Sequence, residues 1–375
     1  MAWIIHFILS NFKHGNKETI KSILKILYKM SIEITKETNV LIQSANKIYS
    51  DNFDGKTWFG RCIFLSWYCD VGTCKFCYRS TQKSRIKHSS HAKRSVSSII
   101  VEVLLSKRLG WRIEFLTGGY KIFPFDQLVR ITKIVSSVYG EKIWLNLGAL
   151  EEKDLIAFKP YVKGIVASIE TVNKELHDDI CPNKPIEPYE KMFELCDSCD
   201  SLKDADFRKS MTMVVGLGEK KEQFEELKEF ISKFDIERIT FYALKPVSGT
   251  PYEHGPTTEE YCWWIAKTRI AFPKLQIIAG TTARRVDEIK QVLLAGANAI
   301  TKFPATKQYA TENAKILEKN VLLAGREFTS TLTNQKLLVD WDWRKEIDEL
   351  TCDEIDSDLK KEVKEKMELY LKRMI

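Results

Sequence analysis

The chain has 375 residues, of which 44% are hydrophobic, 11% aromatic and 29% charged. This composition is typical of a globular protein of one large or two ordinary domains, and it excludes a collagen-like, a disordered and a very small disulfide-bonded chain. The 58 Lys and Arg exceed the 51 Asp and Glu by only 7 and are spread along the chain, so we expect no nucleic-acid partner. No stretch approaches the ~18 apolar residues of a membrane span, so we expect no membrane partner either.

The first 50 residues precede the first expected strand, and we interpret residues 1–50 as an N-terminal helical extension. The apolar run at 3–9 has no basic region before it and no small-residue cleavage site after it, unlike a signal peptide. The nine cysteines are an odd number, which fits a secreted disulfide framework poorly. We therefore expect a cytoplasmic protein, in which clustered thiols hold metal more often than they pair.

Beyond residue 50, short β-rich runs alternate with longer helix-like runs, a pattern typical of repeated βα units around a parallel sheet. Strands are expected at residues 58–66, 112–116, 143–147, 164–169, 209–215, 238–244, 275–279 and 299–303. Helices are expected between them, most clearly at 95–109, 125–139 and 220–234. These eight units predict an α/β fold, a (β/α)8 TIM-type barrel over residues 51–325. The charge-rich residues 326–375 are interpreted as a C-terminal cap that ends in a helix at 359–373.

Three cysteines lie within nine residues, in the loop that follows the first expected strand. They are Cys69, Cys74 and Cys77, with the spacing C-x4-C-x2-C. Barrel enzymes carry their chemistry at this end of the strands. A structural zinc site takes four protein ligands, whereas a [4Fe-4S] cluster held by three thiolates leaves one iron open to another ligand. The count of three therefore favours an iron–sulfur cluster, with a zinc site completed by His88 or His91 as the alternative.

The remaining six cysteines are interpreted as structural. Cys196 and Cys199 form a C-x2-C pair, but no second pair stands at zinc spacing from them. On a helix, these two thiols would be neighbours on one face for reasons of geometry alone. The other four are isolated and are expected to be buried: Cys62, Cys181, Cys262 and Cys352.

The cysteine segment, in which Phe76 precedes the third cysteine, resembles the cluster motif of the radical S-adenosylmethionine (radical SAM) superfamily. The usual spacing in that family is C-x3-C-x2-C, so the first gap is one residue longer here. Over about residues 58–325, further segments are similar, in the same order, to motifs of the biotin-synthase-like group of this family. They begin at Thr117 (TGGY), Asn146 (NLG), Ser168 (SIET), Tyr189 (YEKM), Thr212 (TMVVGLGE), Lys245 (KPVSGTP), Ala279 (AG) and Ala295 (AGAN).

This resemblance implies that Cys69, Cys74 and Cys77 hold a [4Fe-4S] cluster and that the open iron binds S-adenosylmethionine (SAM). A low-potential donor such as ferredoxin or flavodoxin would reduce the cluster. Cleavage of SAM would then produce a 5′-deoxyadenosyl radical, which abstracts a hydrogen atom from a substrate in the barrel. The residues implied to contact SAM are Phe76, Thr117, Gly118, Gly119, Tyr120, Asn146, Glu170, Lys191, Gly216, Gly218 and Glu219.

The sequence departs from the group's motifs at three positions. Thr281 stands where biotin synthase has an Arg that ligates a second cluster, so the insertion of sulfur to make biotin is disfavoured. Lys191 stands where relatives have an Arg that pairs with the SAM carboxylate, so it either substitutes as a point charge or is a surface lysine. Thr212 stands at the first Gly of the motif that lies by the adenine in relatives.

The strand ends from the fifth to the eighth strand are expected to line a substrate pocket. Their polar and basic side chains suggest a small anionic substrate. The candidates are Tyr242, Lys245, Thr281, Thr282, Arg284 and Lys302, together with Met213.

The long first gap is similar to that of the HmdB (HcgA) proteins, which take part in the biosynthesis of the [Fe]-hydrogenase cofactor. We therefore hypothesise a radical SAM enzyme that helps to build the pyridinol of the iron-guanylylpyridinol cofactor, with other cofactor-maturation proteins as candidate partners. The alternatives within the group are a HydE-like maturase and a methylornithine-synthase-like mutase. An alternative of another class is a non-catalytic iron–sulfur electron-transfer or scaffold protein, which the glycine-rich segments disfavour because an electron carrier needs no adenosyl pocket.

Overall fold

The computed structural model describes residues 34–118 and 122–375. Most of the expected N-terminal extension and two expected site residues, Gly119 and Tyr120, lie outside the described residues. Among the residues that are described, no helix is both long enough and apolar enough to cross a bilayer.

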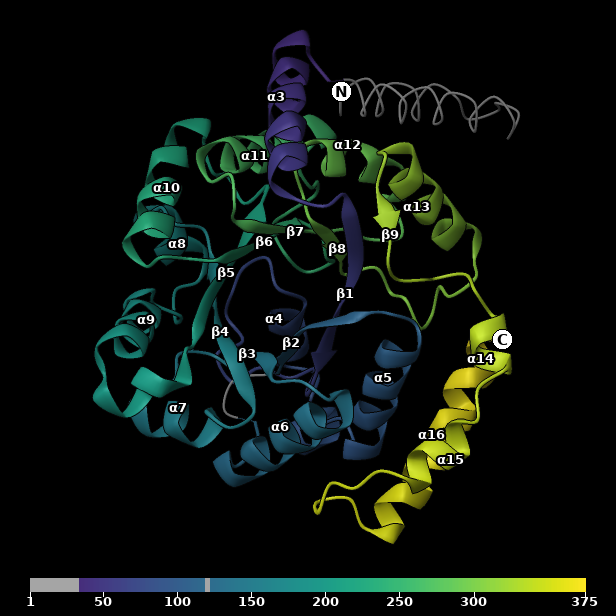
Figure 1. Ribbon diagram of the computed structural model, residues 1–375. Helices are drawn as coiled ribbons and strands as arrows, with labels where there is room; N and C mark the ends of the chain where they lie inside the picture. The colour runs from purple at the N-terminus through teal and green to yellow at the C-terminus, as the bar shows by residue number, and fades with distance from the viewer. Residues whose placement is uncertain (1–33, 119–121) are drawn as a thin grey trace, which may run out of the picture.

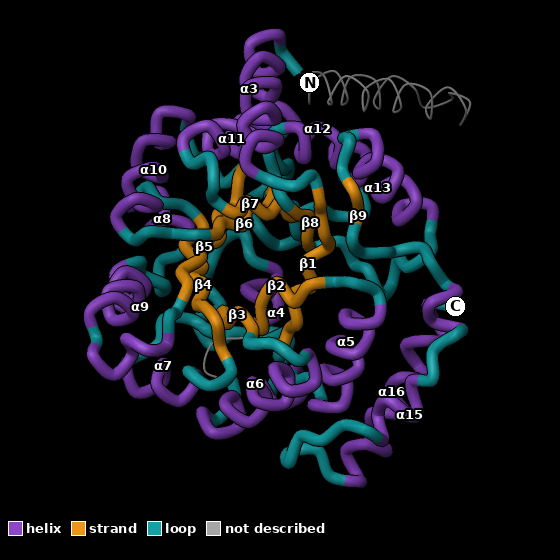
Figure 2. Tube along the Cα trace, viewed as in Figure 1, coloured by secondary structure: helices purple, strands orange, loops and turns teal. Residues whose placement is uncertain are grey.

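Eight parallel strands close into a barrel, whose ring is seen in Figures 1 and 2. Strands β2 to β8 pair in chain order, and β1 pairs with both β8 and β2 and so closes the ring. The predicted α/β barrel is confirmed, and each strand lies within two residues of its expected bounds. The strands are β1 (Lys56–Phe64), β2 (Arg112–Thr117), β3 (Ile143–Asn146), β4 (Val162–Glu170), β5 (Arg208–Val215), β6 (Arg238–Ala243), β7 (Gln276–Gly280) and β8 (Ala299–Thr301).

Helices surround this ring (Figure 2). They are α5 (Val96–Arg108), α6 (Phe125–Tyr139), α7 (Glu152–Phe158), α8 (Lys174–Ile180), α9 (Glu187–Ser198), α10 (Phe224–Lys233), α11 (Thr258–Ala271), α12 (Ile289–Leu294) and α13 (Glu312–Leu323). Helix α6 has its expected bounds because Gly140 follows it with φ +86°, a left-handed conformation that glycine adopts readily. The helix expected at 220–234 is divided into a 3₁₀ turn (Lys221–Gln223) and α10.

Both ends of the described chain pack on the barrel. Helix α3 (Lys36–Asn52) contacts α11, as Figure 1 shows. At the C-terminal end, β9 (Glu327–Phe328) pairs with the start of β1 outside the ring. This strand was not predicted, because two residues carry no periodicity. After α14 (Lys336–Val339) and α15 (Trp343–Asp348), α16 (Ser357–Met374) packs against α5.

A buried carboxylate organises the interior of the barrel. Glu114 on β2 has no exposed surface. It accepts hydrogen bonds from Thr240 Oγ1 (2.8 Å), the Tyr242 hydroxyl (3.1 Å), the Cys62 thiol (2.9 Å) and the Thr301 hydroxyl. A buried carboxylate is costly unless such donors satisfy it. The set of donors therefore fixes the direction of the Tyr242 side chain, whose ring forms part of the cavity described below.

The Ala-Gly-Ala-Asn segment at 295–298 joins β7 to the layer of helices. Asn298 Oδ1 accepts hydrogen bonds from the Arg269 guanidinium (2.6 Å) and from the Ile277 N–H (2.8 Å). Gly296 has φ +102°, and a Cβ there would lie 2.6 Å from Arg269 Cγ. Glycine is therefore required at this position, and this motif has a structural role in closing the barrel.

A buried ion cluster attaches α16 to the rest of the fold. The Glu102 carboxylate on α5 lies 2.8 Å from the Arg61 guanidinium and 3.1 Å from that of Arg94, and the Tyr370 hydroxyl of α16 donates to it at 3.3 Å. Burial raises the pKa of Glu102, but the two arginines outweigh burial and hold it below its ordinary value. Glu102 is therefore ionised at neutral pH.

We expect Glu102→Gln to lower the free energy of unfolding by about 3 kcal/mol at pH 7, because it leaves two buried guanidinium groups without their counter-charge. Since the pKa of Glu102 is lowered in the folded state, its contribution is present above the ordinary value of 4.5 and is lost as the pH falls through the folded-state value. Urea unfolding from pH 7 to 3 measures this, with the exposed Glu365→Gln as the control. An equal loss in both variants would contradict the prediction.

Candidate functional site

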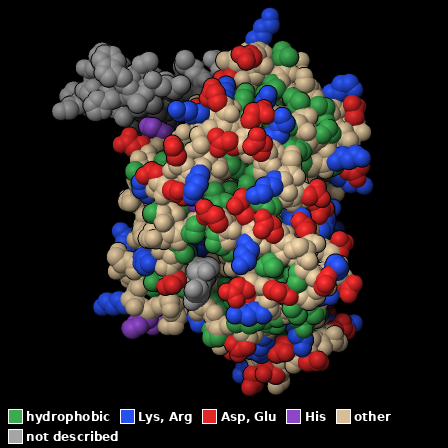
Figure 3. Space-filling view, turned by 90° about the vertical axis from the view of Figure 1, so that its left-hand side faces the viewer, with side chains coloured by type: hydrophobic (Ala, Val, Ile, Leu, Met, Phe, Trp, Pro, Cys, Tyr) green, Lys and Arg blue, Asp and Glu red, His purple; other side chains and the backbone are tan. Residues whose placement is uncertain are grey.

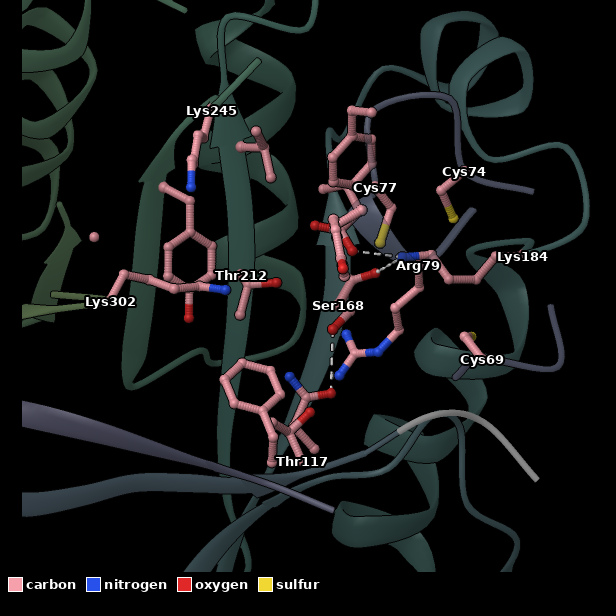
Figure 4. A pocket seen from close by; sticks show the side chains of 18 of the residues that line it. Cys69, Cys74, Cys77, Arg79, Thr117, Ser168, Lys184, Thr212, Lys245 and Lys302 are labelled. Carbon is pink, nitrogen blue, oxygen red and sulfur yellow. Dashed lines mark hydrogen bonds and ion pairs between the residues drawn. The ribbon is translucent and has the colours of Figure 1, made fainter. Parts of the chain in front are cut away.

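A cavity of about 730 Å³ opens at the carboxyl ends of the barrel strands, where parallel barrels place their ligands. Figure 4 shows it with the cysteine thiols and Lys184 on one side and the side chains of Lys245 and Lys302 on the other. Most of the expected site residues line it: Cys69, Cys74, Phe76, Cys77, Thr117, Gly118, Asn146, Glu170, Tyr242, Lys245, Thr281, Thr282, Arg284 and Lys302. The expected substrate residue Met213 does not, because it is fully buried on β5 and its neighbours Thr212 and Val214 line the cavity.

The three cysteines stand on a tight loop between β1 and the short helix α4 (Tyr78–Gln82). Gly72 has φ +49°, and a Cβ there would lie 2.9 Å from the Cys69 carbonyl oxygen, so the turn requires glycine. The ammonium group of Lys83 donates to the carbonyls of Asp70 (2.6 Å) and Val71 (3.1 Å). The residue that follows α4 thus holds the loop in place.

A fourth cysteine lies beside this loop. The Lys75 N–H donates to the Ile180 carbonyl at 2.9 Å, and the thiols of Cys74 and Cys181 are hydrogen-bonded. The Cys181 hydrogen bond lowers the pKa of the Cys74 thiol, whereas burial raises that of Cys77. Cys181 is buried as expected. Its contact with Cys74, a candidate cluster ligand, could not be predicted, because the two cysteines lie far apart in the sequence.

The donor set fits a cluster better than a single metal ion. Three thiols from one loop line one cavity, and thiolates are the usual ligands of iron–sulfur clusters. Within the ranges that the structure describes, no three His, Cys, Asp or Glu side chains are grouped closely enough to hold one metal ion. His88 and His91, which would complete the alternative zinc site, do not line the cavity that the three cysteines line.

An ion pair lies beside the cysteine loop. Lys184 Nζ is 2.6 Å from Glu170 Oε1 and 2.8 Å from the Ser168 carbonyl oxygen (Figure 4). Glu170 is the last residue of β4 and has φ +67°. This left-handed backbone conformation costs energy for any residue other than glycine, and it is often found at functional sites. Burial lowers the pKa of Lys184, but Glu170 outweighs it and the pKa is raised, so the ammonium group stays charged.

Sequence analysis did not predict Lys184 or a second cation, Arg79. The Arg79 guanidinium donates to the Ser66 carbonyl at 3.0 Å and lies 5.2 Å from the centre of the Phe64 ring. Its Nε is buried and has no hydrogen-bond partner among the described residues. Both cations line the cavity, so each can meet a bound carboxylate.

Four expected SAM contacts lie outside the lining of the cavity. Lys191 is exposed on α9, whereas Tyr189 is buried and lines the cavity. Residues two apart on a helix point about 200° apart, so the structure agrees with the interpretation of Lys191 as a surface lysine. Glu219 does not line the cavity either. Its carboxylate accepts from the N–H groups of Gly216 (2.6 Å), Leu217 (2.8 Å) and Gly218 (3.2 Å), so it holds its own loop.

The expected substrate side of the cavity is basic. Lys302 follows β8 with φ +68°, and its Nζ lies 4.9 Å from the centre of the Tyr242 ring. Lys245 and Arg284 reach the same cavity from the ends of β6 and β7. Elsewhere, on the face that Figure 3 shows, acidic and basic side chains are interspersed. The cations in the cavity therefore form a local positive site.

Two family models match the chain. The model of the radical SAM superfamily matches residues 65–231, which include the cysteine loop and the Glu170–Lys184 pair. The model of the biotin and thiamin synthesis associated domain matches residues 240–334, which include Lys245, Arg284 and Lys302.

Relatives and solved structures agree with these matches. A protein of uncharacterised function from Methanocaldococcus jannaschii is 36% identical over 299 residues, which are 79% of this chain and 81% of that protein. The 3-methylornithine synthase of Methanosarcina acetivorans is 21% identical over 278 residues, 72% and 76% of the two chains. The crystal structure of methylornithine synthase (PylB) has a TM-score of 0.64 at 19% identity and covers 80% of this chain and 92% of its own. The FeFe-hydrogenase maturase HydG from Carboxydothermus hydrogenoformans has a TM-score of 0.60 at 14% identity and covers 98% and 93%.

Proposed function

The chain belongs to the radical SAM superfamily, as an enzyme of its biotin-synthase-like group, and we propose that it abstracts a hydrogen atom from a small anionic substrate in the biosynthesis of a cofactor. The cofactors of this family are a [4Fe-4S] cluster and SAM, which together supply a 5′-deoxyadenosyl radical when they are bound. The observation that carries the proposal is that three cysteine thiols, an ion pair and a group of cations line one cavity.

In this proposal, each side of the cavity has its own task. Cys69, Cys74 and Cys77 hold the cluster. Glu170 accepts hydrogen bonds from the ribose hydroxyls of SAM. Lys184 takes the place expected of Lys191 and binds the SAM carboxylate, since an ammonium group has three donors and two of them already meet Glu170 and Ser168.

The opposite side of the cavity binds the substrate. Lys245, Arg284 and Lys302 supply positive charge to an anionic group, and Thr281 and Thr282 supply hydroxyls. The ring of Tyr242, held by Glu114, forms an apolar surface beside Lys302. A pocket inside the barrel limits the access of water to a reactive radical.

For the product, we propose the pyridinol of the iron-guanylylpyridinol cofactor. The long gap between Cys69 and Cys74 supports this assignment, and Thr281, which stands at the position of a second-cluster ligand, disfavours the insertion of sulfur to make biotin. A second candidate is a mutase that makes 3-methylornithine, and the similarity to the enzyme from Methanosarcina acetivorans favours it.

One incubation distinguishes the two products. The reconstituted enzyme is incubated without oxygen with SAM, dithionite and a protein-free metabolite extract of a methanogen, and the products are identified by mass spectrometry. We expect a pyridinol that depends on SAM and is absent with the Cys74→Ala variant. The appearance of 3-methylornithine would replace the first candidate by the second, and SAM cleavage with neither product would contradict both.

A further inference from the structure

A second cavity, of about 370 Å³, lies beside the first one. It is bounded by β1, the loop after β8 and the C-terminal helix α16, which contributes Tyr370 and Arg373. Phe64, Trp67 and Lys302 line both cavities, so the two are neighbours. The rings of Phe64 and Trp67 stack with their centres 5.4 Å apart.

The side chains around this second cavity carry a large excess of positive charge. Five cations and one carboxylate, Glu102, line it. Glu102 is already paired with two of the five, Arg61 at 2.8 Å and Arg94 at 3.1 Å. The remaining three cations are Lys302, Lys307 and Arg373.

These three cations have no carboxylate partner among the described residues. The ammonium group of Lys302 faces the aromatic rings of Phe64 and Tyr242, at 5.3 and 4.9 Å. Arg373 donates Nε to the Leu369 carbonyl of its own helix at 3.2 Å, which leaves its two terminal amino groups as available donors. The Lys307 side chain is exposed, and its ammonium group has no hydrogen-bond or ion-pair partner within the described part of the chain. Like charges that converge on one cavity repel each other until an anion binds between them.

We propose that the second cavity binds the phosphate or carboxylate group of a small molecule. Arg373 and Lys307 would hold the anionic group, and the paired Arg61 and Arg94 add to the positive potential. Trp67 offers an aromatic surface to an organic part that is attached to the anion. The proposal gives the C-terminal helix a role in binding and does not depend on the radical chemistry of the first cavity.

The test is isothermal titration of the full-length enzyme, with its cluster and without oxygen, using inorganic phosphate and ribose 5-phosphate as probes at low ionic strength. We expect one binding site whose affinity falls as salt is added. The double variant Lys307→Gln/Arg373→Gln should weaken it at least about tenfold, because it removes two charge-assisted contacts. The matched control is Lys319→Gln/Lys372→Gln, which changes the net charge equally at positions that are exposed like Lys307 and Arg373 but do not line the cavity.

The two probes identify the source of the anion. Tighter binding of ribose 5-phosphate, lost in Trp67→Ala, assigns the cavity to an organic phosphate. Phosphate binding that is at least as tight assigns it to the free ion. The absence of saturable binding for both probes, or an equal loss in the control variant, overturns the proposal. SAM cleavage without substrate should be unchanged in Lys307→Gln/Arg373→Gln, so failure here is distinguishable from failure of the proposed function.

Discussion

Replacement of Cys69, Cys74 or Cys77 by Ala is expected to reduce the cleavage of SAM at least about a thousandfold, which corresponds to about 4 kcal/mol in the activation barrier. Each variant leaves two thiols in the loop, and these do not hold a [4Fe-4S] cluster in place. The measurements are the iron content after anaerobic reconstitution and the 5′-deoxyadenosine formed with dithionite.

Cys196→Ala is the matched control for these variants. Cys196 is a half-buried thiol on α9 that does not line the cavity, so we expect normal iron content and normal cleavage. Retention of both iron and cleavage in any one of the three loop variants would contradict the assignment of that cysteine as a ligand.

The second large effect is expected at the Glu170–Lys184 ion pair. Lys184→Met removes the ammonium group and leaves the Glu170 carboxylate in the cavity without its partner. The same ammonium group is the one proposed to bind the SAM carboxylate. The loss of one partner of such a charge pair across a binding interface costs about 2–5 kcal/mol, so we expect the Kd of SAM to rise about a hundredfold. Because the pKa of Lys184 is raised, SAM binding by the wild-type enzyme should not change from pH 6 to 9 through this group.

The Lys191→Met variant shows which of the two candidate lysines, Lys184 or Lys191, binds the SAM carboxylate. Lys191 is exposed, so we expect its replacement to leave SAM binding unchanged within about twofold. Equilibrium dialysis with labelled SAM measures both variants, and Lys184→Arg should recover part of the affinity. Weak binding in Lys191→Met together with normal binding in Lys184→Met would reverse the assignment.

Local patterns in the sequence were sufficient to predict the barrel. Strand β5 was predicted as a short β-rich run. Seven of its eight residues are buried, because helices cover one side of the strand and the barrel interior the other. Glycine at 140 ended α6 where the pattern predicted it. The pairing of β9 with β1 was missed, since it depends on contacts between residues far apart in the sequence.

The candidate site could be predicted where residues share one loop. The spacing of Cys69, Cys74 and Cys77 is visible in the sequence because a single turn brings them to one cavity. Lys184 and Arg79 are single cations outside the recognised motifs, and only the folded loops bring them to that cavity. Lys191 was selected by its position in a motif, but the turn of α9 directs it to solvent.

The most direct test of the account is to reconstitute the wild-type chain anaerobically and to measure its metal content and its products from SAM and dithionite. The account predicts about four iron atoms per chain and the formation of 5′-deoxyadenosine and methionine. Tightly bound zinc without cleavage of SAM would contradict it.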